Sequence, residues 1–201
     1  MEKIIGITGG IASGKSTVTN FLRKKGFQVV DADAVVHKLQ KPGGRLYQVL
    51  VQHFGQEIIL ENGELNRPLL ASLIFSNPEE REWSKQTQGE IIREELAALR
   101  DQLAQTEAIF FMDIPLLFEQ GYANWFDETW LVYVDRDIQL ERLMKRDQLS
   151  KESAEVRLAT QWSLDEKKKF ASHVLDNNGS RDQLVSQVVK LLEGGDGCAR
   201  D

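Results

Sequence analysis

The sequence has very little cysteine and lacks any long hydrophobic run. Cys198 is the single cysteine among 201 residues, so a disulfide framework and a cysteine-based metal site are both excluded. The longest apolar stretch, residues 108–118, is interrupted by Asp113 and Pro115, which makes it too short and too polar to span a membrane. No signal peptide precedes the first apolar segment, so we expect a cytoplasmic protein that does not bind membranes.

Positive charge is in the minority. Lysine and arginine number 25 against 31 aspartates and glutamates, for a net charge of −6. Because a nucleic-acid-binding surface is basic, this balance excludes nucleic acid as the main partner. The hydrophobic fraction of 41% and the charged fraction of 28% are ordinary for a globular chain, and the length suits one domain. We expect a monomer.

Glycine is concentrated near the start of the chain, where residues 6–17 read GITGGIASGKST. Gly9 and Gly14 bracket four residues and are followed by Lys15-Ser16, which matches the phosphate-binding loop G-x-x-x-x-G-K-S/T. Glycine lets the backbone turn tightly with its N–H groups aimed at a phosphate, and the following helix adds its positive end.

The loop predicts the ligands of a nucleoside triphosphate. In this motif Lys15 reaches the β- and γ-phosphates and the Ser16 hydroxyl binds Mg²⁺. An apolar strand pattern precedes the loop and helical spacing follows it, as the motif requires. We assign nucleotide binding to the following residues: Gly9, Gly10, Ile11, Ala12, Ser13, Gly14, Lys15, Ser16 and Thr17.

Short apolar runs alternate with helical patterns along the rest of the chain. This alternation is typical of parallel strands covered by helices on both faces. We therefore predict a three-layer α/β fold of the P-loop kinase type with a five-stranded parallel sheet. The strands are expected at residues 3–8, 27–31, 108–113, 129–135 and 173–176.

Two intervals between strands are too long for simple crossovers. Residues 34–107 are predicted to form a helical insertion that binds the phosphate acceptor, and residues 136–170, which are rich in charge, a helical lid. The core is then formed by the remaining segments, 1–33, 108–135 and 171–201.

The predicted lid contains two arginines at helical spacing. Arg142 and Arg146 are four residues apart and so share a helix face. Charged helix faces are commonly just solvated surface, but the place of this one favours phosphate contact. We name Arg142 as the candidate.

Carboxylates follow two of the predicted strands. Asp113 ends the apolar run 109–113, a Walker B pattern in which the carboxylate holds Mg²⁺ through water. Asp31 and Asp33 follow the second strand, at the sheet edge where ligands of open α/β sheets bind. Asp33 suits a general base for an acceptor hydroxyl, but also an N-cap for a helix that begins at Ala34. The residues alone leave both readings open, and we take Asp31 as structural.

Taken together, these features resemble the dephospho-coenzyme A kinase family. The likeness covers nearly the whole chain, and its most particular motifs are Asp31-Ala32-Asp33 and Asp113-Ile114-Pro115-Leu116-Leu117-Phe118-Glu119. Its other motifs are the phosphate loop, Pro42-Gly43, Leu65-Asn66-Arg67, Arg157 to Gln161, and Asp176-Asn177-Asn178-Gly179-Ser180.

This resemblance implies ATP-dependent phosphorylation of the ribose 3′-hydroxyl of dephospho-coenzyme A. It implies Asp33 as the base, which with Lys15 and Arg142 completes the candidate catalytic set. The candidate Mg²⁺ residues stay Ser16 and Asp113, from the phosphate loop and the Walker B pattern. The chain departs from the family pattern at Ala12, which is often Gly, and we expect this to matter little. Two further departures are Asn66, often Asp, and Gln88-Gly89, commonly His-Pro, so we assign no acceptor contact there.

Two alternatives remain at this stage. Another P-loop kinase, acting on a nucleoside monophosphate or a small metabolite, has the same layout. A nucleotide-switch protein shares the phosphate loop, but the Asn-Lys-x-Asp guanine-reading motif of most GTPase switches is absent.

Overall fold

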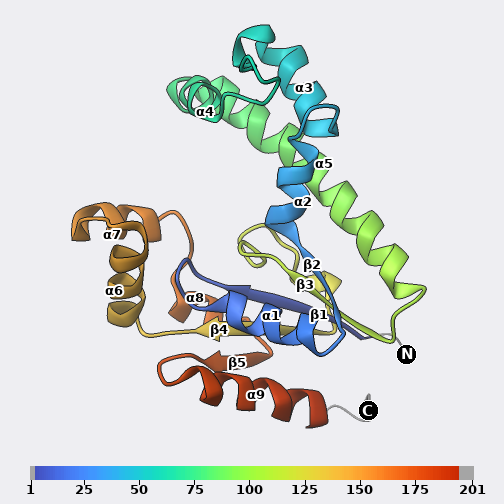
Figure 1. The fold of residues 1–201 in the computed structure, drawn as a ribbon, viewed down its shortest axis with the longest axis vertical. Helices are drawn as coiled ribbons and strands as arrows, with labels where there is room; N and C mark the ends of the chain where they lie inside the picture. Colours follow the sequence, from blue (N-terminus) through green and yellow to red (C-terminus); the bar gives the residue numbers. More distant parts are fainter. Residues whose placement is uncertain (1–2, 195–201) are drawn as a thin grey trace. The chain divides into compact units, whose positions relative to one another are not determined.

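The computed structural model describes residues 3–194, and Cys198 lies outside them. Five parallel strands in this range form one sheet in the order β2-β3-β1-β4-β5 (Figure 1). Their bounds are β1 Lys3–Gly9, β2 Gln28–Asp31, β3 Ile109–Asp113, β4 Glu128–Tyr133 and β5 His173–Asp176. The predicted fold class is confirmed.

The fourth strand ends earlier than predicted. It stops at Tyr133 instead of residue 135, because the main chain leaves the sheet there. The Asp135 N–H donates to the Asn178 side-chain oxygen at 2.8 Å, and Asp135 then immediately precedes a helix.

The chain divides into two compact units. The first contains the residues up to Val30 together with those from Thr106 onward, and the second runs from Asp31 to Gln105. The predicted insertion at 34–107 corresponds to the second unit with small differences at its ends. The predicted lid at 136–170 lies within the first unit.

The first unit consists of the sheet and the helices packed on it. These are α1 Lys15–Lys24, α6 Arg136–Asp147, α7 Lys151–Leu158, α8 Leu164–Lys168 and α9 Arg181–Gly194, with a short 3₁₀ turn, η2, at Ala123–Trp125.

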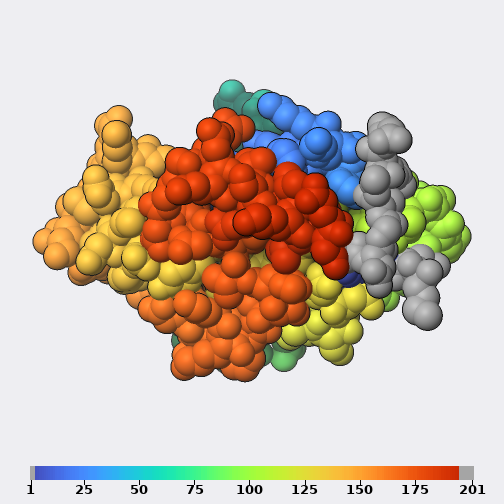
Figure 2. All heavy atoms as spheres, turned by 90° about the horizontal axis from the view of Figure 1, so that it is seen from below, coloured from blue at the N-terminus to red at the C-terminus, as the bar shows by residue number. Residues whose placement is uncertain are grey.

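Alternate residues of β4 face opposite layers of helices, as a strand with period two requires. Trp130 and Val132 pack with the apolar sides of α1 and α9, whereas Leu131 packs with Leu164 of α8. Both faces of the sheet are therefore covered, which explains why its strands are nearly continuous apolar runs. Figure 2 shows the outer side of α9, in red, at the surface of this layer.

The strand β1 lies in the middle of the sheet, between β3 and β4. In the parallel register Ile7 is opposite Asp113 of β3, and Gly9 is opposite Val132 of β4. The residues that follow β1 therefore emerge at the carboxyl edge of the sheet, where β3 and β4 also end. This is the edge at which ligands of such sheets bind.

The second unit is helical. Its helices are α2 Ala32–Leu39, α3 Arg45–Phe54, α4 Arg67–Ser76 and α5 Pro78–Ala104, with a 3₁₀ turn, η1, at Gln56–Ile58.

Local sequence signals fix the starts of two of these helices. Asn66 caps α4 by accepting a hydrogen bond from the Leu69 N–H at 3.2 Å, and Asn77 caps α5 in the same way at Glu79. A proline lies in the first turn of each helix, where its missing N–H costs nothing. Asn66, one of the departures from the family pattern, thus has a structural role here.

Within residues 3–194, no helix is both long enough and apolar enough to cross a membrane.

Candidate active site

The phosphate-binding loop joins the end of β1 to the start of α1. Gly14 is the N-cap residue of α1, and no side chain caps the helix. The first turn of α1 contains no acidic residue, whereas its last turn contains Arg23 and Lys24. No side chain in residues 3–194 therefore accepts a hydrogen bond from the N–H groups at the start of α1, and the positive end of the helix favours an anion.

Two residues of the loop have left-handed backbone conformations. Gly14 has φ of 93°, and a Cβ there would overlap the side-chain amide of Asn177, so only glycine fits. Ala12 has φ of 61°, which costs a residue with a side chain about 1–2 kcal/mol. We expected the alanine at this position to matter little, but it lies where glycine is preferred. Its methyl group packs against α6 and α7, and this contact offsets part of the strain.

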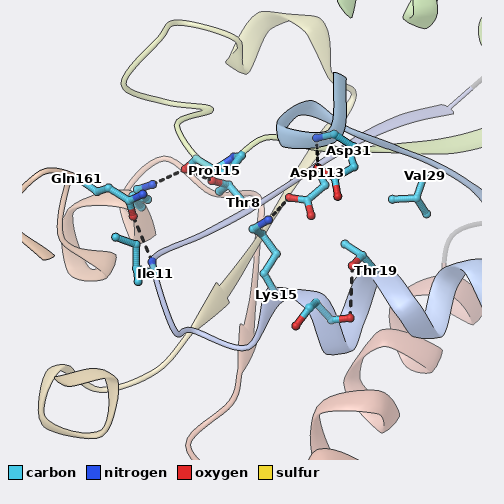
Figure 3. A network of polar contacts seen from close by, with 12 residues as sticks. Thr8, Ile11, Lys15, Thr19, Val29, Asp31, Asp113, Pro115 and Gln161 are labelled. Carbon is cyan, nitrogen blue, oxygen red and sulfur yellow. Dashed lines mark hydrogen bonds and ion pairs between the residues drawn. The ribbon is translucent and has the colours of Figure 1, made fainter. Parts of the chain in front are cut away.

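Three side-chain amides from distant parts of the sequence hold the main chain of the loop. Asn177 Nδ2 donates to the Ser13 carbonyl oxygen at 2.7 Å, and Gln139 Nε2 donates to the Ile11 carbonyl oxygen at 2.8 Å. Gln161 Oε1 accepts a hydrogen bond from the Ile11 N–H at 3.2 Å (Figure 3). The loop conformation therefore depends on residues more than a hundred positions away.

The predicted lysine and carboxylate of the loop region lie together. Lys15 Nζ forms an ion pair with Asp113 Oδ1 (Figure 3). The carboxylate is nearly buried, with 6% of its side chain exposed, and the lysine side chain is 17% exposed. Ser16 lies in the first turn of α1 and is exposed. The parallel pairing of β1 and β3 thus brings the predicted phosphate ligand beside the predicted Walker B carboxylate.

A second lysine near this edge is completely buried. Lys167, in the charged run 167–169, donates to the Pro115 carbonyl oxygen at 2.7 Å and to Glu119 Oε1 at 2.9 Å. The Thr8 hydroxyl donates to the same Pro115 oxygen at 3.0 Å (Figure 3). These bonds attach α8 to the segment that follows β3.

Burial also changes the acidity of this lysine. Desolvation lowers the pKa of Lys167 from its usual 10.5, and the hydrogen bond to Glu119 opposes that shift. The Glu119 Oε2 atom is buried and has no hydrogen-bond partner within residues 3–194. Removing either charge would leave the other buried and unpaired, at a cost of about 3–5 kcal/mol.

The arginines of the predicted lid have different partners. Arg142 donates to the Asn177 carbonyl oxygen at 3.0 Å. Arg146 instead binds Asp147 at 2.7 Å, and the same carboxylate accepts from Arg157 at 2.6 Å. The hydrogen bond from Arg146 lowers the pKa of Asp147. Of these three arginines, Arg142 is the one that contacts Asn177, the residue whose side chain holds the main chain of the phosphate loop.

In the second unit, the structure separates the roles of the two aspartates after β2. The helix α2 begins at Ala32, and Asp31 Oδ1 accepts from the Ala34 N–H at 3.1 Å. Asp31 is therefore the N-cap residue. The reading of Asp33 as the cap of a helix beginning at Ala34 is wrong, because the helix begins two residues earlier. Asp33 is exposed in the first turn, and its catalytic role stays a prediction.

Sequence reasoning missed the residues that support the loop. Gln139 and Lys167 occur among charged residues that suggested a solvated surface, yet both are buried. Asn177 is also nearly buried, with 8% of it exposed. Asn177, Gln161 and Glu119 had one available signal, since each belongs to a motif of the family resemblance.

Comparison with known proteins gives the family. The family model described as Dephospho-CoA kinase matches residues 3–183. A protein of Streptococcus pneumoniae serotype 4 (strain ATCC BAA-334 / TIGR4) with the name Dephospho-CoA kinase is 81% identical over 201 residues, which is the full length of both chains.

Solved structures agree with this assignment. Dephospho-CoA kinase from Campylobacter jejuni has a TM-score of 0.72 and 28% identity, and the match covers 96% of this chain and 99% of that one. Shikimate kinase from Acinetobacter baumannii has a TM-score of 0.55 at 16% identity, covering 98% of this chain and 96% of the other, a likeness of fold alone. With a family model matched from the first strand into the last helix, the chain belongs to the dephospho-CoA kinase family.

Proposed function

We propose that the protein transfers the γ-phosphoryl group of ATP to the ribose 3′-hydroxyl of dephospho-coenzyme A, the last step of coenzyme A synthesis. The observation that carries this proposal is the full-length, 81% identity to a protein named Dephospho-CoA kinase. The intact loop from Gly9 to Thr17 is the matching feature of the structure. The likeness to shikimate kinase extends to fold alone and favours no second acceptor.

In this proposal the loop and α1 bind the phosphates of ATP. The uncapped N–H groups at the start of α1 and the Lys15 ammonium neutralise the β- and γ-phosphates. Arg142, partly buried on α6, stabilises the charge that develops on the transferred group. Its contact with Asn177 keeps it beside the support of the loop.

The residues present fit a magnesium ion that is shared with ATP. Ser16 offers a hydroxyl and Asp113 a carboxylate, both oxygen ligands of the kind that Mg²⁺ prefers. No group of three or more carboxylate, histidine or cysteine side chains in residues 3–194 could hold a metal by itself. This suits Mg²⁺, which keeps several waters and takes its remaining ligands from substrate phosphates. When bound, the ion neutralises charge on those phosphates.

Asp33 is the proposed general base for the acceptor hydroxyl. The support is its exposure and its position two residues beyond the carboxyl end of β2, a strand of the same parallel sheet as β1. Because Asp31 caps α2, the capping requirement does not account for Asp33. In the family layout the helical unit that contains Asp33 would bind the coenzyme A portion of the acceptor.

The test is an acceptor panel with product identification. Purified protein, ATP and Mg²⁺ are incubated with dephospho-coenzyme A, adenosine or AMP, and ADP release is followed by a coupled assay. We expect turnover with dephospho-coenzyme A alone, with a new 3′-phosphomonoester signal by ³¹P NMR. Faster turnover of AMP or adenosine would overturn the assignment. Light scattering during gel filtration should give the mass of a monomer.

A further inference from the structure

Both main-chain polar groups of one loop residue are held by glutamines from the predicted lid. The Ile11 N–H donates to Gln161 Oε1 at 3.2 Å (Figure 3). The Ile11 carbonyl oxygen accepts from Gln139 Nε2 at 2.8 Å. These two groups belong to the two successive peptide units on either side of Ile11. The pair of hydrogen bonds therefore fixes the rotation of both units.

The same region packs against the apolar core of the α6–α7 hairpin. Leu143, Ala154 and Leu158 form that core, and the side chains of Ile11 and Ala12 pack against it. The middle of the loop is thus joined to the hairpin by apolar contacts as well as by hydrogen bonds.

The environment of Gln139 indicates a position built for this contact. It is 4% exposed, so its amide is largely withdrawn from bulk water. A Cβ on Gly10 would come within 2.5 Å of Gln139 Nε2, so the backbone of the loop approaches this amide closely. A hydrophobic side chain of similar size would fill the space but leave the Ile11 carbonyl oxygen without this donor.

We propose that Gln139 and Gln161 are positioning residues for phosphate binding, which hold the Ile11 peptides so that the N–H groups of the loop converge on the phosphates of ATP. They touch the loop and not the substrate. The proposal rests on ATP binding at this loop, as in the proposed function, and it makes the α6–α7 hairpin part of the phosphate-binding apparatus.

The test compares variants that remove one hydrogen bond each. Gln161→Met removes the acceptor of the Ile11 N–H, and Gln139→Met removes the donor to its carbonyl oxygen. Gln183→Met is the matched control, because Gln183 Oε1 accepts from the Ser180 N–H at 2.8 Å at the start of α9. The affinity for ADP is measured by calorimetry well below the melting temperature. The KM for ATP and the KM for the acceptor are measured in the kinase assay.

Each loop variant should weaken ADP binding and raise KM for ATP by about two- to tenfold, the worth of one hydrogen bond. KM for the acceptor should stay unchanged, and the Ile11 amide should exchange faster with solvent. Gln139→Glu, which turns an oxygen toward the Ile11 carbonyl oxygen, should be worse than Gln139→Met. The control should change none of these quantities.

Equal ADP affinity in wild type and both loop variants would overturn the proposal. The proposal would also be overturned if KM for ATP and KM for the acceptor rose together in the loop variants and in the control Gln183→Met. That pattern would indicate general destabilisation. Because Gln161 lies outside a helix and is only partly buried, its variant keeps the test available if Gln139→Met does not fold. ADP binding is measured without the acceptor, so a wrong acceptor assignment would leave this result readable.

Discussion

Replacing Asp33 with Asn separates catalysis from helix stabilisation. The side chain keeps its size but loses its negative charge and its ability to accept a proton. Asp33 is the second residue of α2, and the capping hydrogen bond of that helix comes from Asp31. The substitution therefore leaves the cap in place and removes the interaction of one carboxylate with the positive end of the helix.

The structure sets the size of each effect. An exposed first-turn carboxylate contributes about 0.3–1 kcal/mol to helix stability. In a chain of this length that corresponds to about 1–4 °C in melting temperature. Loss of a general base lowers turnover by about 10²–10⁴, equivalent to about 3–5 kcal/mol in the activation barrier. The base hypothesis therefore predicts a small shift in Tm with a large loss of kcat.

Asp182 provides a matched control. It is the second residue of α9, as Asp33 is of α2, and it is also exposed. Asp182→Asn should lower Tm by a similar amount and leave kcat unchanged. Both variants are measured by thermal unfolding and by ADP release at saturating ATP and dephospho-coenzyme A. If Asp33→Asn retains half of the wild-type turnover, Asp33 is not the base.

Three further predictions concern the phosphate loop and the predicted lid. Lys15→Ala should abolish turnover because it removes the phosphate ligand, and it should also lower Tm because the nearly buried Asp113 carboxylate loses the Lys15 ammonium; kinase assay and thermal unfolding measure the two effects. Hydrogen exchange should show α6 and α7 becoming protected when ATP and acceptor bind, while α8, fixed by the buried Lys167, is already protected without ligands. Burial lowers the pKa of Lys167 in the folded protein below its usual 10.5. Between that lowered pKa and 10.5, the unfolded chain binds more protons than the folded protein does. The free energy of unfolding therefore rises with pH in this window. Lys167→Met lacks this term, so its free energy of unfolding should rise less than that of the wild type as the pH approaches 10.5 from below, as measured by urea titrations.

Each of these predictions has an opposing result. A folded Lys15→Ala variant with wild-type turnover would remove the basis of the nucleotide assignment. Equal exchange of α6 and α7 with and without both ligands would contradict a closing lid, and a large ligand effect in α8 would contradict its fixed attachment. If the free energy of unfolding rises equally with alkaline pH in the wild type and in Lys167→Met, the pH dependence comes from other groups.

Much of the fold could be predicted because its signals are local. The apolar runs gave the five strands to within two residues, and the motif from Gly9 to Ser16 placed the loop between a strand and a helix. The starts of α4 and α5 also carry local signals, since in each an asparagine cap is followed by a proline in the first turn. Such features depend on neighbours in sequence, so a single chain contains the information.

The residues that support the site could not be predicted in the same way. Lys167 stands in a run of three lysines, and nothing in the run distinguishes it from the other two. It is buried because Pro115 and Glu119, about fifty positions earlier in the sequence, lie against it. Gln139 and Ile11 are 128 positions apart. The helix α2 is capped by Asp31, whereas the sequence also allowed Asp33 as the cap. The two positions differ by only two residues, and local sequence patterns define the exact start of a helix poorly.

The central place of β1 and the bond from Asn177 to Ser13 have a consequence for synthesis of the protein. The first strand and the loop are translated before the rest of the sheet, and both neighbours of that strand, β3 and β4, are made about a hundred residues later. The amide that fixes Ser13 arrives later still, 164 positions after the residue that it holds. A nascent chain that stops before residue 109 therefore contains the whole phosphate-binding motif while its first strand lacks both neighbours and remains available for wrong pairing. A chain that stops before residue 177 still lacks the bond from Asn177 to Ser13, so the loop is made early and completed late.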